Sequence, residues 1–165
     1  MQNPKGLDVA ALADHKRAGK GVAEFKGGKA IDRDDLIAVE CDIWVPAARP
    51  DAITEANVDR LNTRIVAEGA NIPATPGAEK ILYDKGVLVL PDFVANAGGV
   101  ICAAMEYHGA NQTVAFDTIA EKLTANTREM LARAKADEVM PRAAAFGIAE
   151  ERVRRAMTTR RFSIF

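Results

Sequence analysis

Asparagines and small residues follow three short apolar runs of this chain, and these residue types could bind a ligand. The runs cover residues 42–46, 64–69 and 86–91. An asparagine side chain both donates and accepts hydrogen bonds, which suits a carboxamide or a ribose hydroxyl. Small residues let a flat ligand approach the backbone. The candidate positions after the runs are Ala47, Ala48, Gly69, Ala70, Asn71, Asn96, Ala97, Gly98 and Gly99.

The same residue types have a plainer explanation, because asparagine and glycine are common in turns. For a single run end, ordinary turn chemistry is the better interpretation. Three such ends at one edge of one sheet would make a ligand site an equally good interpretation. The choice therefore depends on the elements that position these residues.

The three apolar runs predict parallel strands. They are apolar throughout rather than alternating, which is typical of parallel strands covered on both faces. Helical stretches separate them, and this alternation predicts α/β architecture. Right-handed crossovers would place the strands side by side in chain order. Ligands of such sheets bind beyond the carboxyl ends of the strands, so the candidate residues would share one edge.

Helical segments are predicted before, between and after the strands. Thr75 caps one helix, Pro76 opens it and Gly86 ends it, with Ala78, Ile81 and Leu82 on its buried face. The other predicted segments are a helix over 7–18, an extended piece over 21–25, a short helix or turn over 32–39, a helical return over 51–61, and long helices over 93–107, 113–136 and from Pro141 onward. The apolar stripes of the last two carry Phe116, Ile119, Leu123, Met130 and Leu131, then Phe146, Ile148, Val153 and Met157.

Length and composition predict one ordinary domain. A chain of 165 residues fits one hydrophobic core, with a sheet part at about 1–110 and a helical part at about 111–165. A net charge of -1 gives no general reason to expect nucleic acid or an anionic membrane as a partner. No apolar run approaches the length of a membrane span, and the N-terminus has no apolar signal core. We therefore expect a cytoplasmic protein.

The remaining reactive residue types predict neither a metal site nor a catalytic residue. Cys41 and Cys102 lie far apart without metal-ligand spacing, so we interpret them as two small buried thiols. The lysines fall on polar faces or turns. Five arginines near the C-terminus could bind nucleic acid, but a solvated helix face explains them better because no aromatic residues are interleaved. They are Arg152, Arg154, Arg155, Arg160 and Arg161.

Three long segments resemble a known enzyme family. CDIWVPAARPDAIT, RIVAEGANIPATPGAEKIL and GVLVLPDFVANAGGVI are similar, in order and spacing, to consecutive motifs of the glutamate/leucine/phenylalanine/valine dehydrogenases, and are closest to the glutamate dehydrogenase branch. Upstream, NPKGLDVAALADHK resembles the stretch after the second Rossmann strand of that family. The tail AAAFGIAEERVRRAM resembles its closing helix. The resemblance spans nearly the whole chain.

The resemblance implies the C-terminal part of an NAD(P)-binding domain, that is, a partial Rossmann fold with a doubly wound parallel sheet and long C-terminal helices. It implies oxidative deamination of an L-amino acid to a 2-oxo acid, with hydride passing to NAD or NADP. By motif position, Ala47 and Ala48 would present backbone to the cofactor, and Asn71 would lie near the nicotinamide ribose. Asn96 would bond the carboxamide, with Ala97 and Gly98 close to the ring. Val100 and Ala103, in the helix that follows, would line the substrate side.

Two residues depart from the family pattern. Ala103 stands where glutamate-specific members usually have a serine, so the substrate amino acid stays open, with glutamate as the first expectation. Ile72 stands where a glycine is common. The sequence alone does not choose between NAD and NADP.

The resemblance also implies parts that this sequence does not contain. We find neither the Gly-rich phosphate turn of the first βαβ unit nor the substrate domain with the catalytic lysine and aspartate. We therefore expect a fragment that is inactive alone and binds the cofactor weakly or not at all. The strand at 43–45 would become an exposed edge that pairs with another chain, and the long helices would expose an apolar patch. The alternative is a non-enzymatic domain that pairs with or modulates another chain.

Overall fold

The computed structural model describes residues 1–158 of the chain, which form two compact units. One unit consists of Met1–Glu40 and Arg60–Asn62, and the described residues of the other are 41–59 and 63–158. The candidate residues all belong to the second unit. Each unit is described by itself.

The first unit is built from short helical turns. Helix α1 (Val9–Arg17) begins where the Asp8 side chain accepts a bond from the Ala11 amide, and Gly19 ends it in the left-handed region at φ +78°. The 3₁₀ turns η1 (Val22–Glu24) and η2 (Arg33–Ala38) follow. The helix and the turn at 32–39 are confirmed. The extended piece at 21–25 is wrong, because the amides of Glu24 and Phe25 bond back to the carbonyls three residues earlier.

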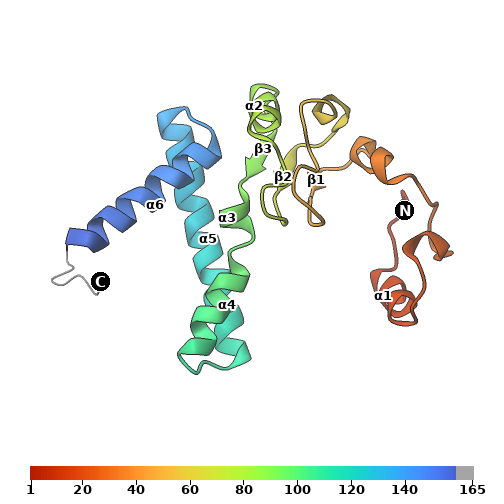
Figure 1. Cartoon of the computed structure of the whole chain (residues 1–165), viewed down its shortest axis with the longest axis horizontal. Helices are drawn as coiled ribbons and strands as arrows, with labels where there is room; N and C mark the ends of the chain where they lie inside the picture. The colour runs from red at the N-terminus through yellow and green to blue at the C-terminus, as the bar shows by residue number, and fades with distance from the viewer. Residues whose placement is uncertain (159–165) are drawn as a thin grey trace. The chain divides into compact units, whose positions relative to one another are not determined.

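The second unit contains a sheet of three parallel strands in the order β1-β2-β3 (Figure 1). They are β1 (Ile43–Trp44), β2 (Ile65–Ala67) and β3 (Leu88–Leu90). The predicted direction and order are confirmed. Val66 and Val89 are buried at the centre, whereas Ile43 and Val45 are each 56% exposed, so the expected burial on both faces fails at β1. The strands are shorter than the apolar runs because the ladder continues only as single bonds, such as Ala70 N–H to Pro46 O at 2.8 Å.

The connection between β1 and β2 is not the predicted helical return. Only the 3₁₀ turn η3 (Val58–Arg60) forms in it. Ile53 instead pairs in the manner of a parallel strand with Ala74, bonding to Pro73 O and to the amide of Thr75. Ile53 and Val58 are fully buried, so this segment contributes to the core as an extended piece.

Helix α2 (Pro76–Asp84) connects β2 to β3 and matches its prediction. The Thr75 hydroxyl accepts a bond from the Ala78 amide at 3.3 Å, and Gly86 follows the helix at φ +75°. Ala78 and Leu82 are fully buried, as expected. The burial of Glu79 on the same face was not expected.

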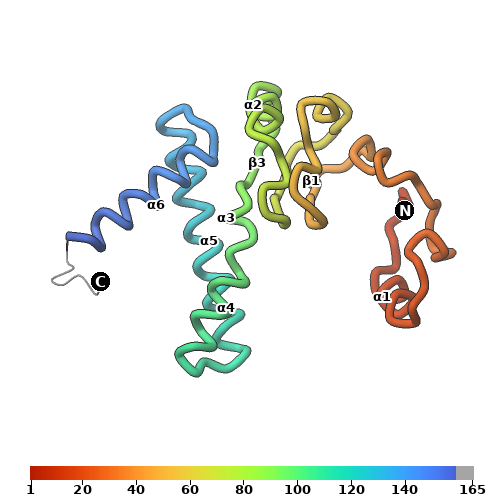
Figure 2. Tube along the Cα trace, in the orientation of Figure 1, coloured from red at the N-terminus to blue at the C-terminus, as the bar shows by residue number. Residues whose placement is uncertain are grey.

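The helix predicted over 93–107 is two helices, α3 (Asp92–Ala95) and α4 (Gly98–Tyr107). The trace passes from β3 through α3 into α4 (Figure 2). Asn96 lies between them with φ -103° and ψ 10°, and its amide bonds to Asp92 O at 2.8 Å. Because the helix is interrupted here, Asn96 does not lie within either helix.

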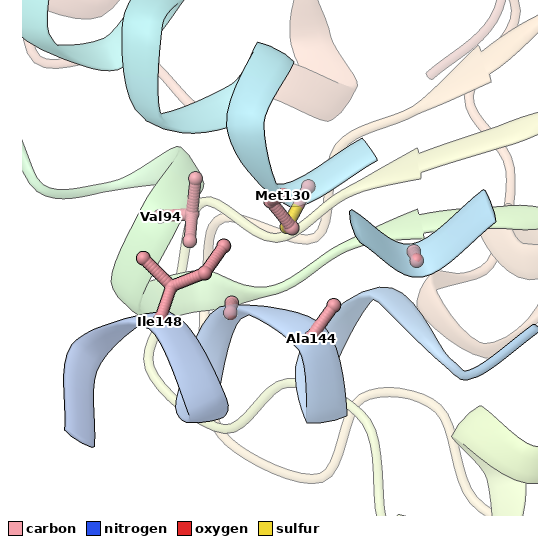
Figure 3. Packing of buried hydrophobic residues seen from close by; sticks show 6 residues of the cluster. Val94, Met130, Ala144 and Ile148 are labelled. Atoms are coloured by element: carbon pink, nitrogen blue, oxygen red, sulfur yellow. The ribbon is translucent and has the colours of Figure 1, made fainter. Parts of the chain in front are cut away.

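Helices α5 (Gln112–Asp137) and α6 (Pro141–Thr158) complete the unit, with α5 packed against both α4 and α6 (Figure 1). Val94, Met130, Ala144 and Ile148 form the core between α3, α5 and α6 (Figure 3). The predicted stripes are therefore correct at Met130 and Ile148. Phe116 is 61% exposed, and Phe146, Val153 and Met157 are exposed as well, which is the apolar exposure expected of the long helices. Along residues 1–158, no helix is both long and apolar enough to cross a membrane.

Candidate functional site

The carboxyl ends of the three strands meet in what we call the strand-end rim, residues 46–48, 69–72 and 96–98. The Asn96 Nδ2 donates to the Asn71 Oδ1 at 2.7 Å and lies 3.4 Å from Gly69 O. These bonds join the segment after β3 to the segment after β2. The two asparagines that the sequence singled out therefore touch, although 25 positions separate them.

The end of β1 reaches the same rim. A Cβ on Gly69 would lie 3.2 Å from the Ala47 Cβ and 3.4 Å from Cγ1 of Val45, so glycine permits this close approach. Ala47 and Ala48 are exposed. The structure thus brings the Ala47, Asn71 and Asn96 segments to one edge of the sheet.

The remaining predicted residues begin helix α4. Ala97 and Gly98 are partly buried at its start, and a Cβ on Gly98 would make ordinary contact with Ile119 at 3.4 Å. Val100 and Ala103 are exposed and lie three positions apart, hence on one helix face. Val100 is 77% exposed, so its side chain can contact a molecule outside the described chain.

Ile72 holds the conformation that a glycine would prefer. Its φ is +49°, and its side chain is exposed. Its amide donates to Asp92 Oδ2 at 2.9 Å. The structure therefore accounts for the glycine expected here: the turn after Asn71 needs left-handed backbone.

A cluster of charges that sequence reasoning missed lies next to the rim. Arg142 of α6 donates to Glu68 at 2.7 Å, to Glu79 at 2.6 Å and to Asp92 at 3.0 Å. Its guanidinium also lies 5.5 Å from the centre of the Phe93 ring. We call these four charged residues the Arg142 cluster. The only signal in the sequence is an acidic residue at the end of the second and third apolar runs, at Glu68 and Asp92.

Burial sets the electrostatics of the cluster. It raises the pKa of Glu68 to about 7, against the opposing effects of the Asp92 amide and Arg142. Burial also disfavours ionisation of Asp92, but the Ile72 amide and Arg142 outweigh it and hold the pKa of that carboxyl below its ordinary value. For Arg142 the bonds to Glu79 and its neighbours outweigh burial and raise the guanidinium pKa. Among the described residues, Oε1 of Glu68 and Oε1 of Glu79 have no hydrogen-bond partner.

The Arg142 cluster is connected to the strand-end rim through neighbouring residues and backbone hydrogen bonds. Glu68 immediately precedes the rim residue Gly69, and its Oε2 accepts a bond from the Asp92 amide at 2.9 Å. Asp92 is the first residue of α3, and its carbonyl accepts from the Asn96 amide. Each rim segment that carries an asparagine is therefore bonded to the cluster.

The other reactive residues do not gather at the rim. Cys41 Sγ lies 3.8 Å from Thr63 Oγ1, and Cys102 Sγ lies 3.9 Å from a Glu106 oxygen on α4. Within residues 1–158, no three histidine, cysteine or acidic side chains are grouped so as to hold a metal ion. Of the C-terminal arginines, Arg152 bonds to Asn126 and Glu129, and Arg154 bonds to Glu150. Arg160 and Arg161 lie outside the described residues.

The sheet and its rim define the class of protein: a partial doubly wound α/β domain of the Rossmann type with long C-terminal helices. A sequence model of the glutamate/leucine/phenylalanine/valine dehydrogenases matches residues 1–161. The chain therefore belongs to this family, as its motifs indicate.

Relatives extend the same assignment. Glutamate dehydrogenase of Aeropyrum pernix is 40% identical over 170 residues, which cover 97% of this chain and 41% of the relative. The solved L-tryptophan dehydrogenase of Nostoc punctiforme is 25% identical with a TM-score of 0.73, over 84% of this chain and 41% of that one. The hetero-hexameric glutamate dehydrogenase of Thermus thermophilus, in its Leu-bound form, shares the fold with a TM-score of 0.79 at 24% identity, over 92% and 37%. The chain thus spans about two fifths of the length of these relatives.

Proposed function

We propose that the chain forms the nicotinamide-facing rim of an amino acid dehydrogenase that converts an L-amino acid to a 2-oxo acid with NAD or NADP. In this proposal the chain is one incomplete dinucleotide-binding domain, and glutamate is the expected substrate. The bound nicotinamide would accept the hydride, while the protein would orient its ring. Family membership supports the class of reaction.

The observation that carries the proposal is the bond between Asn71 and Asn96 at the carboxyl edge of a parallel sheet. Because Asn71 engages the Asn96 Nδ2, the Asn96 oxygen remains as an acceptor for the amide of a nicotinamide. Asn71 would lie beside the adjoining ribose. This is the edge at which open parallel sheets bind their ligands.

Small residues around the asparagines fit a flat ring. Ala47 and Ala48 would face the cofactor through their backbone, and Ala97 and Gly98 would lie close to the nicotinamide. Val100 and Ala103 on α4 would form the substrate side. Since Ala103 has no hydroxyl to donate, it offers a less polar wall than a serine would.

We place the catalytic residues outside this chain. The relatives are more than twice its length, and the lysine and aspartate that the family resemblance implies have no counterpart at the rim. The phosphate-binding turn implied by the resemblance is likewise not among the rim residues. We therefore expect the isolated chain to be inactive, with a dissociation constant for NADH above about 1 mM.

A titration with NADH, followed by nitrogen-15 NMR on the full chain, tests the proposal. We expect shifts confined to residues 47–48, 69–72 and 96–98 at high NADH concentration. Asn96→Ala should abolish them, because it removes the acceptor for the carboxamide. The matched control is Asn62→Ala, an exposed asparagine of the first unit. Shifts elsewhere in the chain, or shifts unchanged by Asn96→Ala, would contradict the proposal.

A second function is favoured by the state of strand β1. Within the described residues β1 pairs only with β2, and the side chains of Ile43 and of Val45, which follows the strand, are each 56% exposed. Unpaired edges bond to other chains through their backbone groups. We propose that this edge, at residues 43–45, pairs with another strand, either in a second copy or in a partner that the chain completes or modulates.

A further inference from the structure

We propose that Arg142 is a positioning residue for the nicotinamide-facing rim, holding the segments that carry Asn71 and Asn96 at a fixed separation. This inference rests on the function proposed above. Arg142 lies on α6, far along the chain from the rim, and it does not belong to the residues assigned to the cofactor. Its influence would pass through Glu68 and Asp92.

The Arg142 guanidinium bonds to residues of three different segments. Its Nη2 bonds to Glu68 at the end of β2, its Nε to Glu79 in α2, and its Nη1 to Asp92 at the start of α3. The three contacts use three different nitrogens. A planar guanidinium fixes the directions of such bonds, whereas an ammonium group is a single point of charge. Arg142 therefore joins the end of β2, helix α2 and the start of α3 through one planar group.

The second step is the continuity of bonds from the cluster to the asparagines. Glu68 accepts from the Asp92 amide, and Asp92 accepts from the Ile72 amide at 2.9 Å. Ile72 is the neighbour of Asn71 in the chain. On the other side, the Asn96 amide bonds to Asp92 O at 2.8 Å. Asp92 is thus the residue through which both asparagine segments are anchored, and Arg142 holds its carboxylate.

The third step concerns what the cluster contributes. Three carboxylates gathered around one guanidinium are a poor means of stabilising a fold, since desolvation of the ions offsets their attraction. Glu68 is fully buried, and an oxygen of Glu68 and one of Glu79 find no partner within the described residues. A fixed rim geometry explains the arrangement better than stability does.

Arg142→Lys tests the inference, because it retains the positive charge and loses the three-way bonding. We expect a folded chain in which Ile72 amide exchange is roughly tenfold faster. The side-chain amide resonances of Asn96 should move toward the positions of a solvated asparagine. NADH affinity should fall about tenfold, as expected when aligned groups are misplaced. The matched control is Arg152→Lys on the same helix. Arg152 bonds to Asn126 and Glu129 on α5, so this variant should leave all three measurements unchanged.

The two proposals fail in different ways. If Arg142→Lys leaves Ile72 exchange and the Asn96 resonances as in the wild type, the positioning role is overturned whether or not NADH binds. Suppose that Ile72 exchange and the Asn96 resonances both change in Arg142→Lys, but the wild-type chain shows no NADH-dependent shifts at the rim. The positioning role of Arg142 then stands, and the proposed function fails. Should Arg142→Lys not fold, Asp92→Asn decides the matter. It weakens the tie to Arg142 while retaining an acceptor for Ile72, and unchanged Asn96 resonances in it would overturn the role.

Discussion

At the scale of single residues, the rim depends on backbone conformations that side chains do not favour. Ile72 stands at φ +49°, where a β-branched residue carries a cost of about 1–2 kcal/mol. The bond from its amide to Asp92 holds it there. The expectation of a glycine at this position follows from the family resemblance, and the structure supplies the reason.

Replacing Ile72 by glycine should therefore leave the chain equally stable or more stable. Relief of the strained φ outweighs the added freedom of the unfolded chain, which costs about 0.5–1 kcal/mol. Urea unfolding followed by circular dichroism measures the difference. Val45→Gly is the control, because Val45 is similarly exposed but has no positive φ, and it should lose about 1 kcal/mol. A loss as large in Ile72→Gly would refute the strain argument.

Glu68 should make stability depend on pH in the neutral range. Its pKa is raised from 4.5 to about 7 in the folded chain, so the folded state binds the proton more tightly. The contribution of Glu68 to stability is therefore fully present below pH 4.5 and is lost as the pH rises through 7, a loss of about 3 kcal/mol. Asp92 has the opposite effect in a different pH range. Because its pKa is lowered, its contribution to stability is lost only on acidification below its ordinary pKa of 3.8.

Glu68→Gln removes the titrating group and should flatten the melting temperature between pH 5 and 8, while Arg142, Glu79 and Asp92 remain. Differential scanning calorimetry across that range provides the measurement. Glu121→Gln, on the exposed face of α5, serves as the control and should keep the wild-type slope. An unchanged slope in Glu68→Gln would mean that burial does not shift this carboxyl.

At the scale of elements, the sequence patterns predicted the features that depend on residues close together in the chain. The direction and order of the three strands follow from their apolar runs and the connections between them. The contact between the Asn96 and Asn71 side chains could not be predicted in this way, because it spans 25 positions. The Arg142 cluster is beyond sequence patterns for the same reason: Glu68 and Arg142 are 74 positions apart. Both are tertiary contacts that no periodicity encodes.

The Thr75 cap offers a test at this scale, since α2 leads from the rim to β3. Thr75 accepts from the Ala78 amide and donates to a Glu55 oxygen at 2.8 Å. Thr75→Ala should lower the free energy of unfolding by about 1 kcal/mol, as loss of a helix cap does. Thr75→Ser retains the hydroxyl and should stay close to the wild type. Equal stability of the alanine and serine variants in thermal unfolding would show that the cap contributes nothing.

At the scale of the whole molecule, apolar surface remains open in the second unit. The exposed side chains are Ile43 of β1, Val45 directly after β1, and Phe146, Val153 and Met157 of α6. Exposed apolar patches of this kind mark contact surfaces.

We expect the chain to self-associate in solution through β1. Val45→Lys places a charge on the edge and should raise the monomer fraction, because edge lysines block strand pairing. Sedimentation velocity at several concentrations measures this. Val9→Lys, at an exposed position of α1 in the first unit, is the control and should associate like the wild type. A wild-type chain that sediments as a monomer at every concentration would rule out self-association through this edge.

The central claim is that three parallel strands deliver Ala47, Asn71 and Asn96 to one surface that receives a nicotinamide ring. The most direct test is a search for nuclear Overhauser effects between the ring protons of NADH and the full chain at high NADH concentration. We predict contacts from the ring to the side-chain amide of Asn96 and to the backbone of Ala97 and Gly98. Ring contacts to α1 or to the exposed face of α6, with none to Asn96, would contradict the claim.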